Sequence, residues 1–424
     1  MRVLLISSNT ETINMPVYPA GLYCVALALA REDHTVEILD LLESKSPEQD
    51  VAETIRKFSP GVIGISVRNI DNQDMEDTRF LLEPVREVVR ICKQTTEAPV
   101  VLGGAGYSMY PESALEYLGA DMGIAGEGEN AFTRLVHCLE NGLDANGIPG
   151  LYRAASGWTG VENRISDLDT FPLPDPSSIS GTIRDADSIR LPYQTRRGCP
   201  MDCSYCSTGN IEGRRLRKRS IPDITANLAL WEKAGVRHFF FADNTFNLPP
   251  TYAKALCRAI IAAKLNIRWR CIIYPKHVDE ELAGLMTGAG CTEVSLGFES
   301  ASPKVLNALN KKFGPSDIEQ ASANLAAAGI TRMGFLLLGG PGETLDTVEE
   351  SLAFADKLDL DMLKLTLGIR IYPDTALARQ AVKEGIIRPD DPLLWPRFYL
   401  SEQLKDRLPG RINEWARKRP GLVV

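Results

Sequence analysis

Three cysteines share one short loop, at Cys199, Cys203 and Cys206, in a C-x3-C-x2-C spacing. Three thiolates cannot complete a structural zinc site, which requires four ligands. They can hold three corners of a cubic iron–sulfur cluster, and the fourth iron is then left without a protein ligand. An open iron can bind and cleave a small molecule. Ordinary thiols prefer burial, whereas this loop is rich in Arg, Gly, Pro and Asp.

The loop has an aromatic residue, Tyr205, directly before the last cysteine, and it resembles the cluster motif of the radical S-adenosylmethionine (SAM) family. In that family, the amine and carboxylate of SAM fill the open iron. The resemblance implies that Cys199, Cys203 and Cys206 bind a [4Fe–4S] cluster and act in catalysis, and that Tyr205 lies at the SAM site.

The composition is that of a globular protein, with 44% hydrophobic and 24% charged residues over 424 positions, enough for two or three domains. No apolar run reaches the roughly 20 residues of a membrane span, and the N-terminus predicts a strand, not a signal peptide. We expect a cytoplasmic protein without a membrane partner. The net charge of −8 argues against nucleic-acid binding. Scattered thiols without a disulfide pattern fit a reducing compartment; they are Cys24, Cys92, Cys138, Cys257, Cys271 and Cys291.

Residues 1–149 alternate apolar strands with amphipathic helices, which predicts a parallel sheet covered on both faces. The expected strands are Arg2–Ser7, Thr35–Leu39, Val62–Val67, Val100–Gly104 and Met122–Ala125. The expected helices lie near Ala20–Ala30, Val51–Phe58, Thr78–Lys93 and Asn130–Glu140. A ligand of such a sheet binds beyond the carboxyl ends of the strands.

Glycines follow two of these strands, where they let a ligand approach the backbone closely. They are Gly103 and Gly104 after the fourth strand, and Gly126-Glu127-Gly128-Glu129 after the fifth. Together with the cysteine loop, this pattern resembles the cobalamin-binding domain of class B radical SAM enzymes. The resemblance implies a Rossmann-like cobalamin domain over residues 1–149, with Gly103, Gly104, Gly126, Glu127 and Gly128 at the cofactor.

No histidine stands where a cobalt ligand is expected. His34 is the only histidine before residue 137, and it lacks the Asp-x-His-x-x-Gly context of mutase-type cobalamin domains. We therefore expect base-off cobalamin, with its lower face near Arg68 or Asn69 on the loop after the third strand. The alternative is that these two side chains cap a helix or meet solvent.

The remainder divides into a Pro- and Asp-rich linker at 150–186, a region at 187–385 with six strand–helix repeats, and an extension at 386–424. The expected strands are Ile189–Gln194, Phe239–Ala242, Trp269–Tyr274, Glu293–Phe298, Arg332–Leu338 and Leu363–Ile371. Six repeats suit a partial (β/α)6 barrel, whose catalytic groups gather at the carboxyl ends of the strands. The extension is predicted to hold helices near Ser401–Arg407 and Arg411–Lys418, and either closes the barrel or binds a partner.

The later strand ends carry residues that the resemblance places at the SAM site: Asp243, Glu299, Gly340 and Arg370. A carboxylate can accept hydrogen bonds from ribose or an ammonium group, glycine admits adenine, and arginine holds a carboxylate. Helix caps and turns are the alternative roles. The basic run Arg214–Arg219 is either a solvated surface or a positive wall that binds phosphate or carboxylate.

The resemblance as a whole implies a cobalamin-dependent radical SAM methyltransferase that moves a methyl group from SAM, via methylcobalamin, to an unactivated carbon. It implies an electron donor such as ferredoxin or flavodoxin. We expect a protein or peptide substrate, and the narrower hypothesis is a glutamine of methyl-coenzyme M reductase. The alternatives are a non-methylating cyclase or ring-contracting enzyme and a non-catalytic cobalamin or iron–sulfur module. A methylthiotransferase is disfavoured because no second close-set cysteine triad precedes the first.

Overall fold

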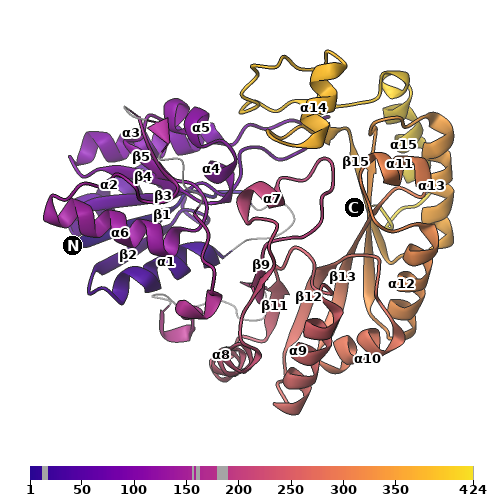
Figure 1. Cartoon of the computed structure of the whole chain (residues 1–424), viewed down its shortest axis with the longest axis horizontal. Coiled ribbons are helices and arrows are strands. Elements are labelled where there is room, and N and C mark those ends of the chain that lie inside the picture. The colour runs from indigo at the N-terminus through magenta and orange to yellow at the C-terminus, as the bar shows by residue number, and fades with distance from the viewer. Residues whose placement is uncertain (12–17, 155–156, 159–162, 179–189, 424) are drawn as a thin grey trace.

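The chain forms two α/β units that lie side by side (Figure 1). The computed structural model describes residues 1–11, 18–154, 157–158, 163–178 and 190–423. The expected strand start at 189 falls outside these residues. Within them, no helix is long and apolar enough to cross a membrane.

The N-terminal sheet has the order β2-β1-β3-β4-β5-β6-β7. Its first five strands are parallel, as predicted: β1 (Arg2–Ser7), β2 (Thr35–Asp40), β3 (Val62–Ser66), β4 (Val100–Gly103) and β5 (Met122–Ile124). The linker was expected to begin at 150, but β6 (Leu151–Arg153) and β7 (Gly157–Trp158) extend the sheet as antiparallel strands. Their runs of two or three residues are too short to show alternation in the sequence.

Successive residues of β1 face opposite sides of the sheet, as the strand repeat requires. Val3 and Leu5 pack with α1 (Ala20–Ala30) and α6 (Gly128–Asn141), whereas Leu4 and Ile6 pack with the other helices. That second layer consists of α2 (Pro47–Phe58), α3 (Leu82–Thr95) and α5 (Pro111–Leu118). The short helix α4 (Ala105–Met109), which the sequence analysis did not predict, begins directly after Gly104.

The second unit is an arc of six parallel strands in the order β15-β14-β13-β12-β11-β8. The strands are β8 (Leu191–Tyr193), β11 (His238–Phe241), β12 (Arg268–Ile273), β13 (Cys291–Glu299), β14 (Thr331–Leu338) and β15 (Met362–Leu367). Its outer helices are α8 (Ile221–Lys233), α9 (Pro250–Ala262), α10 (Glu280–Gly288), α11 (Pro303–Ala308), α12 (Pro315–Ala327) and α13 (Leu345–Lys357). The edges β8 and β15 do not pair with each other, so the barrel is partial, as predicted.

The last predicted strand is split. Gly368, at φ +71°, turns the chain after β15, and β16 (Ile369–Arg370) pairs instead with β17 (Phe398–Tyr399). After α14 (Ala376–Lys383), the tail ends in α15 (Leu408–Arg417). Leu408, Ile412 and Trp415 of this helix are buried in the barrel core, so the extension is an integral part of the barrel unit. Ser401–Arg407 was expected to be helical, but only a 3-10 turn forms there, at Glu402–Leu404.

Candidate functional site

A cavity of about 470 Å³ lies between the two units. Its floor is the carboxyl ends of β1, β3, β4 and β5, its sides are α1 and the first turn of α6, and its far wall is β8 and β11 of the barrel. The lining is mainly apolar, and the size is within the usual range for ligand sites. The carboxyl ends of the parallel strands are therefore open to a ligand, where the sequence analysis expected one.

Six of the seven predicted cobalamin residues line this cavity: Arg68, Gly103, Gly104, Gly126, Glu127 and Gly128. Asn69 does not line it. A Cβ on Gly103 would meet only the Ile124 carbonyl oxygen, at 3.9 Å, so the missing side chain leaves cavity space open. Gly104 has φ +97°, and a Cβ there would lie 2.6 Å from the Val67 carbonyl oxygen, so this turn needs glycine.

None of the histidines in the described residues lines the cavity. His34 instead lies 3.1 Å from the N-terminal amine, and its Nδ1 is 3.8 Å from the Glu140 carboxylate. A corrin seated here would meet Arg68 and no imidazole. The glycine floor leaves room for a corrin, and base-off binding stays a prediction.

The cysteine loop is fixed at both ends by backbone hydrogen bonds. Gly198, at φ +88°, donates its N–H to the Glu212 carboxylate at 2.9 Å, and Cys199 donates its N–H to the Gly213 carbonyl at 3.0 Å. Farther along, the Ser204 N–H donates to the Leu309 carbonyl at 3.0 Å. The loop is held by the barrel rather than by its own regular structure.

The three thiols are close enough to influence one another. Burial raises the pKa of Cys199 to about 11, and the neighbouring Cys206 and Cys203 contribute in the same direction. Among the residues described, no three ligand side chains converge on a single metal-ion position. A cubic cluster instead spreads three thiolates over three irons, so this spacing fits a cluster. Binding the cluster would displace the thiol protons.

Glu299 lies beside the cysteine loop in a buried polar group. It ends β13 at φ +63°, and its Oε1 accepts hydrogen bonds from the Tyr205 hydroxyl at 3.0 Å and the Lys311 ammonium at 3.2 Å. Burial alone would lower the pKa of Lys311, but Glu299, Tyr205 and Cys203 more than offset it and hold that pKa well above its usual value. This polar group includes Tyr205 of the cysteine loop itself, and its contact with SAM stays a prediction.

Lys311 was not among the residues predicted for the site. In the sequence it is one of two adjacent lysines after a short helix, and such pairs are usually solvated. The structure buries this one, with 6% of its side chain exposed, while its neighbour Lys312 lies at the surface. The difference in burial between Lys311 and Lys312 is visible only in the folded structure.

Asp243 and Arg370 are committed to contacts within the protein. Asp243 is fully buried and accepts hydrogen bonds from the Thr195 N–H at 2.8 Å, the Thr195 hydroxyl at 2.5 Å and the Arg196 N–H at 3.2 Å. We expected Arg370 to hold a carboxylate of SAM; the carboxylate that it holds is Asp71, at 2.8 Å. A contact of either side chain with SAM stays a prediction.

Gly340 is a turn residue in this structure. Its N–H donates to the Glu343 carboxylate at 2.9 Å, and a Cβ there would press on Ile369 at 3.2 Å. These contacts account for the glycine, and its approach to adenine stays a prediction.

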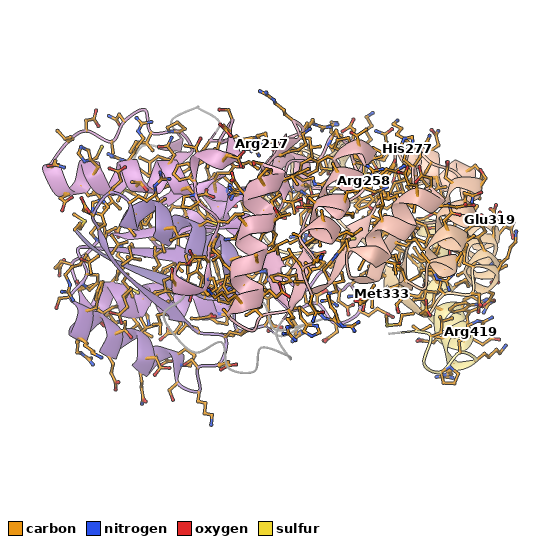
Figure 2. The ribbon with its side chains drawn as sticks, turned by 90° about the horizontal axis from the view of Figure 1, so that it is seen from below. Arg217, Arg258, His277, Glu319, Met333 and Arg419 are labelled. Atoms are coloured by element: carbon orange, nitrogen blue, oxygen red, sulfur yellow. The ribbon has the colours of Figure 1, made fainter. Side chains whose placement is uncertain are left out.

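The basic run does not form a uniform positive wall. Arg214 and Arg215 are exposed, whereas Arg217 and Arg219 are buried. Arg217 lies where the two units meet (Figure 2) and pairs with Glu127 at 2.7 Å. Arg219 lines the cavity, and one of its nitrogens donates to the carbonyls of Leu168 and Phe171. The basic run therefore contains two buried arginines, Arg217 and Arg219, and two solvated ones, Arg214 and Arg215.

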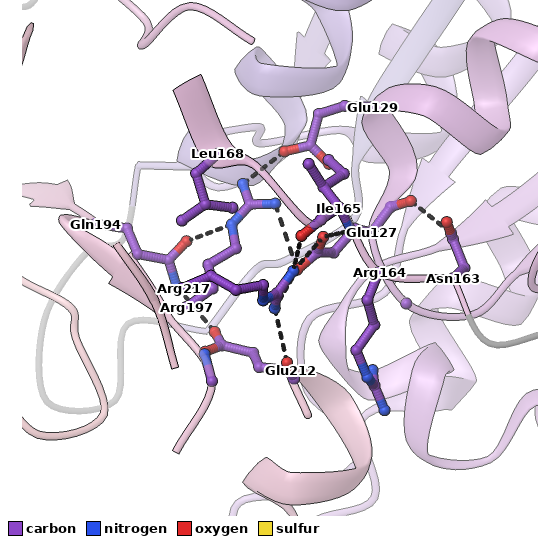
Figure 3. A network of polar contacts seen from close by, with 12 residues as sticks. Glu127, Glu129, Asn163, Arg164, Ile165, Leu168, Gln194, Arg197, Glu212 and Arg217 are labelled. Atoms are coloured by element: carbon purple, nitrogen blue, oxygen red, sulfur yellow. Dashed lines mark hydrogen bonds and ion pairs between the residues drawn. The ribbon is translucent and has the colours of Figure 1, made fainter. Parts of the chain in front are cut away.

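Glu127, predicted to be a cobalamin contact, also belongs to a polar network between the units (Figure 3). Next to it, Glu129 pairs with Arg197 at 2.5 Å, and this arginine precedes the first cluster cysteine by two residues. Burial raises the pKa of Glu129, but the Arg197 guanidinium more than offsets this, so the net pKa is lowered and the carboxylate stays charged.

Comparison with known proteins agrees with this geometry. Residues 6–136 match the B12 binding domain, and residues 193–355 match the radical SAM superfamily. An uncharacterized methyltransferase of Pyrococcus horikoshii is 29% identical, and the alignment covers 96% of this chain and 91% of the relative's length. The tryptophan 2-C-methyltransferase of Streptomyces laurentii is 25% identical, covering 89% of this chain and 74% of its own.

A relative with a different reaction also aligns. The anaerobic magnesium-protoporphyrin IX monomethyl ester cyclase of Rubrivivax gelatinosus is 28% identical over 85% of this chain and 67% of its own. Among solved structures, the radical SAM methyltransferase TsrM from Kitasatospora setae, with cobalamin and a [4Fe–4S] cluster bound, superposes with a TM-score of 0.86 at 23% identity. It covers 98% of this chain and 88% of its own, and so shares the whole fold. With a match to the B12 binding domain over this cavity and a match to the radical SAM superfamily around this cysteine loop, the chain combines the two domains of cobalamin-dependent radical SAM enzymes and is similar to methyltransferases of that kind.

Proposed function

We propose that this chain methylates an unactivated carbon of a small organic molecule held between its two units. The observation that carries the proposal is that the cobalamin cavity and the cysteine loop share walls. Gln194, Arg197 and Glu212 line the cavity, and Glu212 also binds the backbone of Gly198 at the start of the loop. A substrate at this junction would reach both cofactors.

When bound, the cluster and SAM supply a carbon-centred radical, and cobalamin supplies the methyl group. The residues of the chain hold and orient these groups. Cys199, Cys203 and Cys206 would hold the cluster, and the Glu299–Lys311 pair would orient the polar end of SAM. The mainly apolar cavity would exclude water from the transfer.

The glutamine of methyl-coenzyme M reductase is the narrower hypothesis for the methyl acceptor. The relatives whose names state a substrate act on tryptophan and on a tetrapyrrole ester, which favours a small molecule. A protein substrate would have to reach the same cavity between the units. We therefore propose a small-molecule acceptor and treat the protein glutamine as an outcome of the test.

The test is anaerobic reconstitution with iron, sulfide and cobalamin, followed by incubation with SAM, a reductant such as ferredoxin, flavodoxin or dithionite, and candidate acceptors. Mass spectrometry of the product is expected to show the gain of one CH2 unit, with deuterium from methyl-labelled SAM. A peptide containing the reductase glutamine is tested in parallel. Methylation of that peptide alone would replace the small-molecule proposal.

A second candidate function is cyclisation without methylation, which the cyclase relative favours. Its product would lose hydrogen and carry no label from the SAM methyl group. A binding module without turnover would form no 5′-deoxyadenosine. The three outcomes are distinct in one experiment.

A further inference from the structure

The turn Gly126–Glu129 contacts both the cobalamin cavity and the barrel unit. All four of its residues line the cobalamin cavity, yet its two carboxylates bind arginines of the barrel unit. We call Glu127, Glu129, Arg197 and Arg217 the polar latch. Their side chains are only 5–11% exposed, and Glu127, Glu129 and Arg197 also line the cavity. A charge buried this deeply is costly without its partner.

The latch continues into the cysteine loop. The Arg197 Nε donates to the Gln194 side-chain oxygen at 2.9 Å, and Gln194 donates to the Glu212 Oε1 at 2.9 Å. The other oxygen of Glu212 accepts the Gly198 N–H at 2.9 Å, one residue before Cys199. An unbroken chain of polar contacts therefore joins Glu129 in the cavity wall to Gly198, the residue before the first cluster cysteine. Figure 3 shows its part from Glu129 through Arg197 and Gln194 to Glu212.

Arg217 makes a second set of contacts within the latch. Arg217 donates to the carbonyls of Glu212 at 2.7 Å and Ile165 at 2.5 Å, in addition to its pair with Glu127. Glu127 also accepts the Ile165 N–H at 2.5 Å. Arg217 thus contacts three segments: the turn Gly126–Glu129 of the N-terminal unit, the linker between the units at Ile165, and the segment after the cysteine loop at Glu212.

We propose that the polar latch couples the two cofactors, so that each binds more tightly when the other is present. A corrin in the cavity would remove water from Glu129 and Arg197 and strengthen their attraction. The ordered Arg197 would hold Gly198 and the loop in place, and the cluster would then bind a loop that is already ordered. By linkage, the cluster raises the affinity for cobalamin by the same factor. The latch residues are positioning residues, and the proposal rests on the two cofactors and not on the identity of the methyl acceptor.

The test measures cobalamin affinity, by absorbance titration with hydroxocobalamin, on cluster-free and cluster-loaded wild-type chain. Couplings of this kind span roughly 5- to 150-fold, and we expect a cluster-loaded affinity on the order of tenfold higher. The cluster midpoint potential and electron paramagnetic resonance signal should shift when cobalamin is added. In Glu129→Gln, the affinity ratio should fall to about one and the shift should disappear, with the cluster still present.

Glu140→Gln is the matched control. It lies on the same helix and in an ion pair, but that pair is with the N-terminal amine and outside the cavity. It should keep the wild-type ratio and shift. Arg197→Lys keeps the charge but loses the planar fork of donors, so it should lose most of the coupling.

Equal cobalamin affinity with and without the cluster in the wild type would overturn the proposal, as would full coupling in Glu129→Gln. If Glu129→Gln does not fold, Arg197→Lys and Gln194→Met decide the matter by the same two measurements. Neither leaves Glu129 without a cation. Failure of the methyl-transfer assay would leave these outcomes unchanged, because they require no acceptor.

Discussion

The two units meet along two edges of different character. At the polar edge, the latch, with its Glu129–Arg197 ion pair, lies beside the cavity and the cysteine loop. At the apolar edge, residues such as Leu82 and Tyr110 of the N-terminal unit share one core with Ile369 and Leu393 of the barrel unit. The Asp71–Arg370 ion pair is enclosed there, with 2–3% of either side chain exposed. The apolar edge can supply the energy of docking, whereas the polar edge can fix positions at the cofactors.

Two buried glutamates show the same difference. At the polar edge, Arg197 keeps the pKa of Glu129 below its ordinary value despite burial. Glu343 is also buried, but none of the described residues places a cation in ion-pair contact with it. Burial raises its pKa to about 7, although the N–H groups of Gly339 and Gly340 oppose the shift. Gly340 in turn lies against Ile369 of the apolar edge. The negative charge is favoured at Glu129, which faces a cation, and disfavoured at Glu343, which is buried without one in ion-pair contact among the described residues.

The largest expected effect is loss of the cluster from the polar edge. Changing Cys199, Cys203 and Cys206 together to Ala should remove all iron and the brown absorbance, because no other described thiol lies in that loop. Cobalamin should still bind, weakened only by the coupling factor. Iron analysis after reconstitution is the measurement, and four irons per chain in the triple variant would contradict the assignment.

The next largest effect is expected from breaking the Asp71–Arg370 ion pair at the apolar edge. Arg370→Met leaves Asp71, whose side chain is 2% exposed, buried without its cation. Breaking such a pair costs about 3–5 kcal/mol, to be measured as the free energy of unfolding in denaturant. The double variant Asp71→Asn with Arg370→Met should recover part of the loss. Glu349→Gln, which breaks the surface pair with Arg411, should cost at most about 1 kcal/mol.

If the two edges act separately, folded Arg370→Met will retain the wild-type affinity ratio for cobalamin with and without the cluster. Loss of this ratio would show instead that the apolar edge also positions the cofactors.

A third effect is a pH dependence from Glu343. Its folded-state pKa of about 7 lies above the ordinary 4.5, so the folded protein binds the proton more tightly. This contribution is fully present below pH 4.5 and is lost as the pH rises through about 7. At 1.36 kcal/mol per pKa unit, the loss is about 3 kcal/mol. The difference in unfolding free energy between wild type and Glu343→Gln, followed from pH 4.5 to 8, should show it; a constant difference would refute it.

The sequence predicted the cofactors and the parallel strands because these depend on local patterns. A C-x3-C-x2-C loop and glycines at strand ends are contiguous in the chain, and short apolar segments mark β1 to β5 and the six barrel strands. The sequence could not show contacts between residues that are distant in the chain. Asp243 contacts Thr195, and Arg370 contacts Asp71, so each carboxylate or cation that looked available for SAM is already paired.

The polar latch was hidden for the same reason. Glu129 and Arg197 are 68 residues apart, and in the sequence each belongs to a separate motif. Arg217 and Arg219 looked like members of one basic run, but the antiparallel pair β9 (Arg196–Arg197) and β10 (Arg217–Lys218) buries alternate side chains of it. Only this pairing distinguishes the buried arginines from Arg214 and Arg215.

A smaller effect is expected at the cavity floor. Gly103→Leu should fold, because a Cβ there meets only one atom within 4 Å, but the side chain should occupy space needed by the corrin or its tail. We expect cobalamin affinity to fall about tenfold or more, which corresponds to about 1.4 kcal/mol. Gly284→Leu, on the open surface of α10, is the control and should bind normally. Unchanged binding in Gly103→Leu would place cobalamin elsewhere.

The smallest effect separates the two halves of the basic run. Among the described residues, Arg219 has no carboxylate in ion-pair contact, although it is buried and lines the cavity. A guanidinium in that position suits an anion such as the phosphodiester of cobalamin. Arg219→Gln should weaken cobalamin binding several-fold and leave the iron content unchanged. The exposed Arg215→Gln should change neither, since a solvated charge contributes only about 0–1 kcal/mol. Equal cobalamin affinities in the two variants would mean that Arg219 serves only the Leu168 and Phe171 carbonyls.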